Sequence, residues 1–207
     1  KAAAFAQQKT IRNIIIPNSI KSIGDFAFAY SAVQEIIILD GMTEIGDYAF
    51  YYCEDLKSIV IPDSVQSLGD YAFENCPELE SIHIPYGVTR IGAHTFMYCQ
   101  FESIVIPETV TTIGEQAFQH TGLIDVILPE GVTTIEFRAF SDCKNLQKVS
   151  LPNSLHTIGY ASFSNCKNLS GNLVIPNSVI EIGSYAFSQC TILHGTLTLS
   201  NQLTKIS

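Results

Sequence analysis

The chain has 207 residues, of which 46% are hydrophobic and 15% charged, and its formal net charge at pH 7 is −9. This composition is typical of a folded protein. The acidic excess and the lack of a lysine or arginine cluster argue against a nucleic-acid partner, because phosphate backbones would be repelled. No run of about 18 apolar residues is present, so we expect no membrane insertion by this segment.

One motif recurs along the whole chain. Its last residue is a phenylalanine that returns every 22 to 24 residues, at Phe5, Phe28, Phe50, Phe73, Phe96, Phe118, Phe140, Phe163 and Phe187. A fixed period in the twenties is typical of a solenoid, in which each turn of chain buries its apolar side against its neighbours. We therefore predict a single domain, residues 1–207, of about nine repeats. The first and last copies are incomplete, which suggests a fragment of a longer protein.

Each repeat is predicted to begin with a strand, which ends at a proline in all copies except the two that have Leu39 or Ser200 in that slot. In one copy, Leu56, Ile59 and Ile61 precede Pro62. Positions two apart on a strand point to the same side, so Ile59 and Ile61 are predicted to face the core. Proline then ends the pairing, because it has no backbone donor. The prolines that fill this slot are Pro17, Pro62, Pro85, Pro107, Pro129, Pro152 and Pro176.

A second short extended piece and a helical turn are predicted to complete the repeat. Val65 and Leu68 form the next inward pair, and Gly69 lets the chain bend to the opposite side. Residues 70–76 are predicted to form about one helical turn with Phe73 inward. Glu136 occupies the glycine slot of another copy, where we expect local distortion.

The motif resembles a known repeat family. Ile61-Pro62-Asp63-Ser64-Val65 through Cys76 is similar, almost slot for slot, to the leucine-rich repeat of BspA-like surface proteins of anaerobic, oral and gut bacteria and some protists. The resemblance implies an α/β leucine-rich-repeat solenoid, a right-handed superhelix with a parallel β-sheet on the concave face and short helical turns or loops on the convex face. It also implies an extracellular or cell-surface location and a role in adhesion or protein binding. It supplies no catalytic residue.

Six cysteines share the slot three residues after the phenylalanine: Cys53, Cys76, Cys99, Cys143, Cys166 and Cys190. We interpret them as a ladder of small, half-buried side chains. Disulfides between rungs remain an alternative, although side chains at identical positions point in parallel and not toward each other. A zinc site is a weaker alternative, because a straight ladder cannot surround a metal tetrahedrally. We expect no metal site and no cofactor.

The sequence offers little for catalysis. Tyr98, His120 and Asp142 share the slot two residues after the phenylalanine, so they are expected to stack on successive rungs. A His-Asp pair is an ingredient of catalytic sites, but no nucleophile converges on this one and a ladder has no cleft. We interpret it as a polar stack facing solvent, and we expect no enzyme activity.

The outward position between the two inward residues of each strand is the candidate binding surface. These positions, here called the stripe, are Ile15, Ile37, Val60, His83, Val105, Ile127, Ser150 and Val174. An exposed apolar stripe with polar flanks is typical of a recognition surface. The alternative is that β-branched residues are simply favoured in strands, whatever faces them.

Two functions remain open from the sequence. The first is a non-catalytic module, plausibly an adhesin, that binds a protein ligand such as an extracellular-matrix or other surface protein. The second is a structural spacer that presents another domain at the cell surface. We expect the chain to be a monomer in either role.

Overall fold

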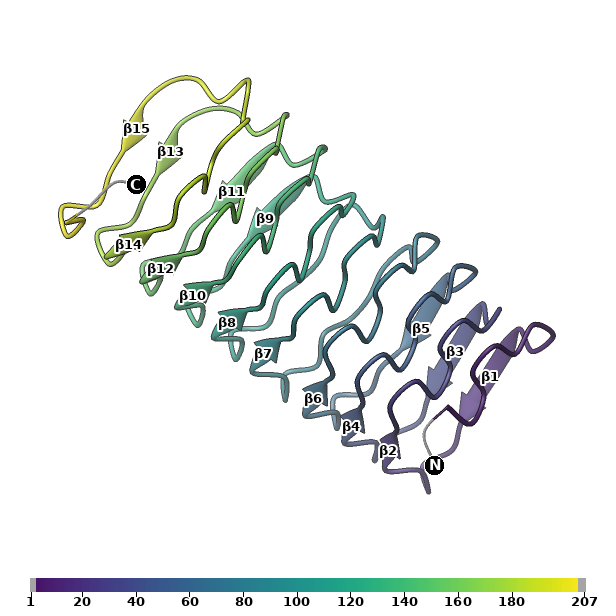
Figure 1. Cartoon of the computed structure of the whole chain (residues 1–207). Helices are drawn as coiled ribbons and strands as arrows, with labels where there is room; N and C mark the ends of the chain where they lie inside the picture. Colours follow the sequence, from purple (N-terminus) through teal and green to yellow (C-terminus); the bar gives the residue numbers. More distant parts are fainter. Residues whose placement is uncertain (1–2, 205–207) are drawn as a thin grey trace.

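The computed structural model describes residues 3–204 as a stack of rungs, one for each sequence repeat (Figure 1). The first segments of the repeats, most of which end at a proline, supply a first series of strands: β1 (Asn13–Ile16), β3 (Glu35–Ile38), β5 (Ser58–Val60), β9 (Asp125–Ile127), β11 (Lys148–Ser150), β13 (Leu173–Val174) and β15 (Leu197–Thr198). A second series comprises β2 (Ser22–Ile23), β4 (Glu44–Ile45), β6 (Ser67–Leu68), β7 (Arg90–Ile91), β8 (Thr112–Ile113), β10 (Thr134–Ile135), β12 (Thr157–Ile158) and β14 (Glu181–Ile182). Among residues 3–204, no helix suited to crossing a bilayer occurs.

Strands of successive rungs pair in parallel and keep equivalent positions opposite one another. Ile15 of β1 lies opposite Ile37 of β3, which lies opposite Val60 of β5. In the second series, Ile113 of β8 lies opposite Ile135 of β10. The predicted parallel rungs in register are confirmed, and the fold is a parallel-strand β-solenoid.

The first series is interrupted in its middle. Residues 81–84 and 103–106 were predicted to be strands, but neither is assigned to a strand, and the series divides into the sheets β1-β3-β5, β9-β11 and β13-β15. Their inward side chains Ile82, Ile84 and Ile106 nevertheless remain buried. Apolar burial therefore keeps these segments in line where regular pairing is absent.

The prolines that end the first segments also open tight turns. The Pro62 carbonyl accepts a hydrogen bond from the Val65 N–H at 3.1 Å, and the Pro129 carbonyl accepts one from the Val132 N–H at 3.0 Å. A bond from the N–H of residue i+3 to the carbonyl of residue i closes a β-turn. The turn carries the chain from the first strand series into the second.

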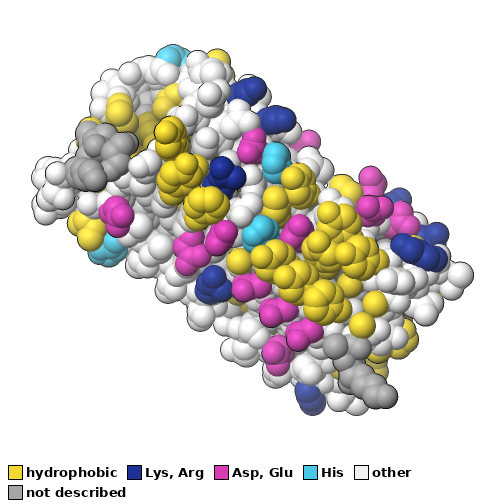
Figure 2. All heavy atoms as spheres, in the orientation of Figure 1, with side chains coloured by type: hydrophobic (Ala, Val, Ile, Leu, Met, Phe, Trp, Pro, Cys, Tyr) yellow, Lys and Arg dark blue, Asp and Glu magenta, His cyan; other side chains and the backbone are white. Residues whose placement is uncertain are grey.

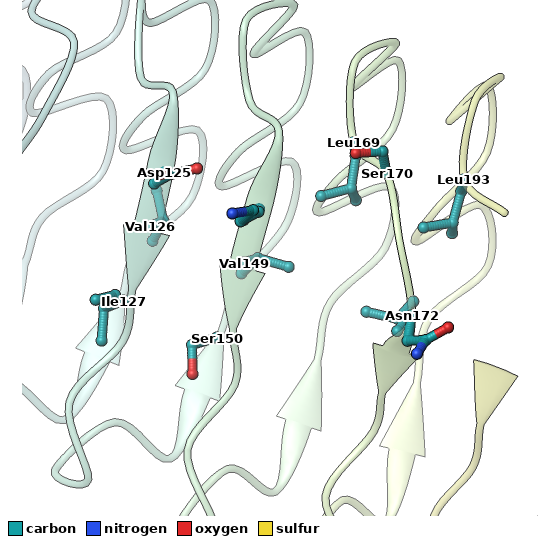
Figure 3. Close-up of a pocket in the computed structure, with 11 residues that line it drawn as sticks. Asp125, Val126, Ile127, Val149, Ser150, Leu169, Ser170, Asn172 and Leu193 are labelled. Atoms are coloured by element: carbon teal, nitrogen blue, oxygen red, sulfur yellow. The ribbon is translucent and has the colours of Figure 1, made fainter. Parts of the chain in front are cut away.

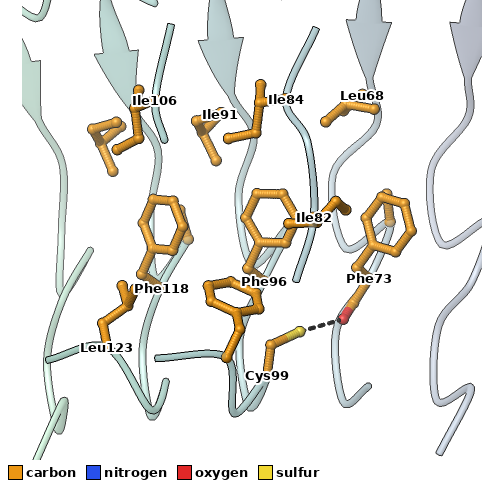
Figure 4. Close-up of a cluster of buried hydrophobic side chains, with 14 of the residues drawn as sticks. Leu68, Phe73, Ile82, Ile84, Ile91, Phe96, Cys99, Ile106, Phe118 and Leu123 are labelled. Carbon is orange, nitrogen blue, oxygen red and sulfur yellow. Dashed lines mark hydrogen bonds between the residues drawn. The ribbon is translucent and has the colours of Figure 1, made fainter. Parts of the chain in front are cut away.

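The core is a continuous ladder of the repeat phenylalanines. Their eight successive ring pairs have centroids 5.1–5.8 Å apart and interplanar angles of 2–21°. Figure 4 shows Phe73, Phe96 and Phe118 with inward side chains of neighbouring segments around them. The rings from Phe50 to Phe163 are fully buried. The predicted inward position of the repeat phenylalanine is confirmed for these rungs, whereas Phe5 in the first rung is 47% exposed.

The segment that carries each phenylalanine is not helical, so the predicted helical turn at residues 70–76 is wrong. The N–H groups of Tyr71, Phe73 and Asn75 donate to carbonyls one rung along, at 2.8–2.9 Å. Between them, the Glu74 N–H closes a tight turn on the Tyr71 carbonyl at 3.2 Å. A helix would satisfy these donors within its own turn, whereas the solenoid uses them to tie the rungs together.

Positive φ angles accompany these turns. Tyr71 and Asn75, which lie two residues before and after Phe73, have φ of 61° and 57°. A pair at the same two positions flanks every one of the nine repeat phenylalanines, and none of its members is a glycine. The left-handed region costs an L-residue roughly 1–2 kcal/mol, so the bonds between rungs must outweigh a repeated local penalty.

The cysteine column caps backbone carbonyls. The Cys99 thiol donates to the carbonyl of Phe73, one rung earlier, at 3.2 Å (Figure 4). The other five thiols make the equivalent bond at 3.0–3.2 Å. All six are free, and burial raises the pKa of Cys99 to about 12. The ladder of parallel, unpaired thiols is confirmed, and the thiols are more buried than expected.

The glycine slot provides space between rungs. A Cβ added to Gly69 would lie 2.4 Å from the backbone nitrogen of Asp47 and 2.4 Å from the carbonyl carbon of Gly46. Such a separation is shorter than any van der Waals contact, so a side chain at Gly69 would push these two rungs apart, although the equivalent slot accepts Glu136 in another rung.

Glu136 occupies the glycine slot without the expected distortion. Its N–H still donates to the carbonyl of Ile113 at 2.9 Å, and β10 pairs in register with both β8 and β12. Its Oε2 accepts the backbone N–H of Glu115 at 2.9 Å. In three other rungs the backbone N–H at the position equivalent to Glu115 donates to an aspartate one rung earlier. One rung before Glu115 this position is occupied by Ala93, whose side chain cannot accept a hydrogen bond. Glu136 therefore supplies the missing acceptor.

Candidate functional site

The structure places all eight stripe positions on the outside of the solenoid. Six lie in first-series strands, while His83 and Val105 lie in the two unpaired segments between β5 and β9. The exposed fractions are largest for Val105, Ile127 and Ile15, at 82%, 75% and 67%. Large apolar side chains are therefore presented to solvent along one face.

Strand alternation explains this exposure. In β3, Ile36 and Ile38 are 1% and 2% exposed, whereas Ile37 between them is 43% exposed. Successive side chains of a strand leave opposite faces, so burying the first and third residues forces the second outward. The same logic applies to Val60 in β5 and Ile127 in β9, whose neighbours point into the core.

The stripe is not one uninterrupted row. Ile15, Ile37 and Val60 are brought side by side by direct strand pairing. Ile127 lies opposite Ser150 in a separate sheet. Val174 belongs to a third sheet, and no strand pairing joins it to the other two groups within residues 3–204. The structure therefore divides the predicted surface into an apolar N-terminal group and a more varied C-terminal part.

His83 introduces a polar point in the middle of the stripe. Its Nε2 lies 2.8 Å from Oδ1 of Asp63, and both side chains are largely exposed. An exposed pair of this kind contributes little to stability. It offers instead a hydrogen-bonding group between the apolar parts of the surface.

A hollow that the sequence did not predict opens beside the stripe. It has a volume of about 330 Å³ and lies between β9, β11 and β13 (Figure 3). Apolar side chains including Val149, Leu169 and Leu193 line it, together with the charged side chains of Asp125 and Lys148. An apolar lining with a few polar groups is typical of a site that accepts a side chain or a small ligand.

An inserted glycine accompanies the hollow. Gly171 precedes β13, has φ of 81° and adds one residue to its repeat. Ser170 still donates to the Gln147 carbonyl at 3.1 Å, but β13 then pairs with β15 and not with β11. The extra residue in the repeat length was the sequence signal for this break in the sheet.

The His-Asp stack is a side-by-side ladder and not a convergent site. The Tyr98 and His120 rings stack with centroids 4.6 Å apart, and His120 Nε2 lies 3.8 Å from Asp142 Oδ2. Burial opposes ionisation of Asp142, but hydrogen bonds from Asn165 and Ser141 and the nearby His120 lower its pKa overall. These contacts hold an anion in place and do not activate a nucleophile. Across the described part of the chain, no cluster of three potential metal ligands occurs.

The chain matches a known family of repeat proteins. The family model described as BspA type Leucine rich repeat region matches residues 1–124 and 111–207, with six copies. No protein with a curated functional description matches the chain.

Solved structures of bacterial repeat proteins are similar to it. A leucine-rich repeat protein from Bacteroides ovatus is 33% identical, with a TM-score of 0.74, over 93% of this chain and 46% of that one. A leucine rich cell surface protein from Faecalibacterium prausnitzii is 25% identical, with a TM-score of 0.55, over 92% of this chain and 60% of that one. A leucine rich repeat protein of T. pallidum is 26% identical, with a TM-score of 0.62, over 86% of this chain and 77% of that one. The chain therefore spans less than two thirds of the first two proteins.

Proposed function

Because the chain belongs to the BspA-type leucine-rich repeat family, we propose that it is a non-catalytic protein-binding module of a cell-surface or secreted protein. Leucine-rich repeat domains generally act as protein-interaction scaffolds, and BspA-type proteins are typically associated with the bacterial surface. The role proposed for this chain is that of an adhesin, which contacts host or bacterial proteins through the stripe.

The exposed stripe is the observation that carries this proposal. Nine rungs about 4.8 Å apart give a face roughly 40 Å long, which can accommodate a protein footprint of about 800 Å². Ile15, Ile37 and Val60 form a continuous apolar group on that face. Burial of such side chains in an interface stabilises a complex by about 25 cal/mol per Å² of apolar area, so a partner that covers this group gains binding free energy.

A structural spacer is the second candidate function, and the phenylalanine ladder favours it. Rings that stack through eight consecutive pairs join the rungs into one continuous interior. Such a rod holds a domain at a distance from the surface without any partner of its own. In this case the stripe would reflect the strand preference of β-branched residues alone.

Binding measurements distinguish the two. The chain is passed over immobilised, purified extracellular-matrix proteins and bacterial surface proteins, and binding is recorded by surface plasmon resonance. The adhesin proposal predicts saturable binding to at least one protein with a Kd of about 1 μM or tighter. Absence of binding to every protein of the panel contradicts the adhesin role and favours the spacer. Sedimentation of the free chain tests the expected monomer.

A further inference from the structure

A cluster of aromatic side chains lies outside the core and outside the stripe. Each turn segment carries three side chains on its outer side, at positions two before, one after and two after the repeat phenylalanine, although the middle one is buried in rungs such as those of Ala29 and Glu74. In the N-terminal rungs six of these are aromatic and form what we call the aromatic patch: Phe26, Tyr30, Tyr48, Tyr51, Tyr52 and Tyr71. Figure 2 shows a hydrophobic patch toward the N-terminal half of this face, with acidic side chains along its border.

The rings of the patch are held rigidly against one another. Phe26, Tyr48 and Tyr71 stack in a column with centroids 4.4–4.5 Å apart. Tyr51 packs edge-on against Tyr30 and Tyr48, with centroids 5.3 Å apart in both pairs. Ring faces within the column are covered by their neighbours, so the ring edges are the part of the column that a partner can contact. A partner therefore meets a surface that loses little conformational entropy on binding.

The fold does not require aromatic residues at these positions. Tyr30 and Tyr52 have positive φ, a conformation that suits asparagine and aspartate better than a bulky residue. In later rungs the same slot is filled by Asn75, Asp142 and Asn165, and also by Tyr98, His120 and Gln189, so it accepts non-aromatic residues without loss of the turn. Aromatic side chains in the N-terminal rungs thus go against the local backbone preference, which indicates a role other than folding.

Carboxylates run along the border of the patch. Asp25, Asp47 and Asp70 each accept the backbone N–H one rung along through Oδ1, at 3.0, 2.8 and 2.7 Å. This bond fixes the orientation of each carboxylate, and Asp70 also lies 3.3 Å from Arg90. The rungs around the patch are also negatively charged, because residues 22–137 contain eighteen aspartates and glutamates but only two basic residues, Lys57 and Arg90.

We propose that the aromatic patch and its aspartate border form a second interaction surface, which binds an extended protein segment rich in arginine or lysine. Apolar residues between the basic ones, together with the aliphatic stems of the arginine or lysine side chains, pack on the ring edges, and the charged heads reach the carboxylates. Charge complementarity selects a cationic partner and repels an acidic one. The surface is distinct from the stripe, so it does not depend on the adhesin proposal.

A peptide titration tests this surface. The chain contains no tryptophan, and five of its nine tyrosines lie in the patch, so tyrosine fluorescence reports binding directly. The probe is a synthetic peptide in which arginine alternates with leucine, and the comparison peptides alternate arginine with serine or glutamate with leucine. The proposal predicts saturable binding of the arginine–leucine peptide at physiological salt, at least about tenfold weaker binding of arginine–serine, and none of glutamate–leucine.

Matched variants locate the binding. The double variant Tyr30→Asn/Tyr52→Asn introduces the residue that the fold already uses at Asn75, and it is expected to weaken binding at least about tenfold. Asp47→Asn keeps an acceptor for the Asp70 N–H but removes a charge, so it is expected to weaken binding and reduce its salt dependence. Tyr98→Asn changes the same slot outside the patch and is expected to leave binding unchanged.

Three results would overturn the proposal. The first is equal affinity of the double variant and the unaltered chain, with circular dichroism showing both folded. The second is equal affinity for the arginine–serine and arginine–leucine peptides, which would reduce the effect to bulk charge. The third is dimerisation through the patch, seen as a doubled sedimentation mass that the double variant abolishes; the patch would then bind a second copy.

Discussion

Glu74 gives the chain a pH-dependent stability that a single substitution can isolate. Its carboxyl group is buried, its Oε2 makes no hydrogen bond, and burial raises its pKa from 4.5 to about 7. The folded state therefore holds this proton more tightly than the unfolded state. By linkage, the free energy of unfolding falls as pH rises from about 4.5 to about 7. One pKa unit corresponds to about 1.4 kcal/mol, so the loss is about 3.5 kcal/mol at most and about 2 kcal/mol after partial solvent screening.

His94 acts in the opposite direction over the same pH range. Its Nδ1 lies 3.7 Å from Glu74 Oε2, and burial lowers its pKa although Glu115 and Asp70 favour the charged form. Because its folded pKa is depressed, its contribution to stability is lost as pH falls. A single pH profile of the unaltered chain would mix these two effects. Because both chains retain His94, the comparison with Glu74→Gln removes the part of the histidine contribution that does not depend on its contact with Glu74.

Urea unfolding followed by circular dichroism measures the difference. At about pH 5 the two chains are expected to be similarly stable, and at about pH 8 Glu74→Gln is expected to be more stable by about 2 kcal/mol. Glu78→Gln makes the same charge change at an exposed position and controls for net charge. A stability difference between Glu74→Gln and the unaltered chain that stays constant from about pH 5 to about pH 8 would show that burial does not raise the pKa of Glu74.

Three further predictions concern the interior. Phe118→Ala removes a fully buried ring and is expected to lower the free energy of unfolding by about 3–5 kcal/mol. The control Phe137→Ala, at an exposed position, is expected to cost less than about 1 kcal/mol. Equal losses would contradict the claim that the repeat phenylalanines form the core. Gly69→Ala is expected to cost about 2 kcal/mol or more in urea unfolding, because its Cβ would lie 2.4 Å from backbone atoms; an unchanged midpoint would show that the rungs separate freely. The buried thiols are expected to react with a thiol reagent far more slowly in the native state than in urea, and equal rates would show that they are accessible.

Inward residues of the fold were predictable because each slot occurs about nine times. The phenylalanine ladder, the parallel register and the cysteine column all follow from repetition and strand alternation. The turn segments were not predictable in the same way. The three-residue spacing from Phe73 to Cys76 is compatible with a helical turn, and only the neighbouring rung supplies the carbonyls that accept the N–H groups of Tyr71 and Phe73. A contact between repeats of this kind is invisible in a single repeat.

The binding surface was predictable in part for the same reason. Alternation placed Ile37 and Val60 outward, and the structure shows both exposed. The interruption at residues 81–84 was not predicted, because Ile82 and Ile84 keep the inward pattern although the segment is unpaired. The aromatic patch was missed because the repeat was interpreted through its inward slots. The tyrosines on either side of the phenylalanine were its sequence signal.

The most direct test of the account is the effect of removing the apolar stripe on binding. The triple variant Val60→Thr/Val105→Thr/Ile127→Thr keeps β-branched side chains in place and removes exposed apolar surface from the face. Against a protein that binds the unaltered chain in the surface plasmon resonance panel, it is predicted to lose at least about tenfold in affinity while circular dichroism and thermal melting remain unchanged. The matched control, Thr112→Val/Thr134→Val/Thr157→Val on the second strand series, is predicted to bind normally. Unchanged affinity of the folded triple stripe variant would contradict the claim that this face binds the partner.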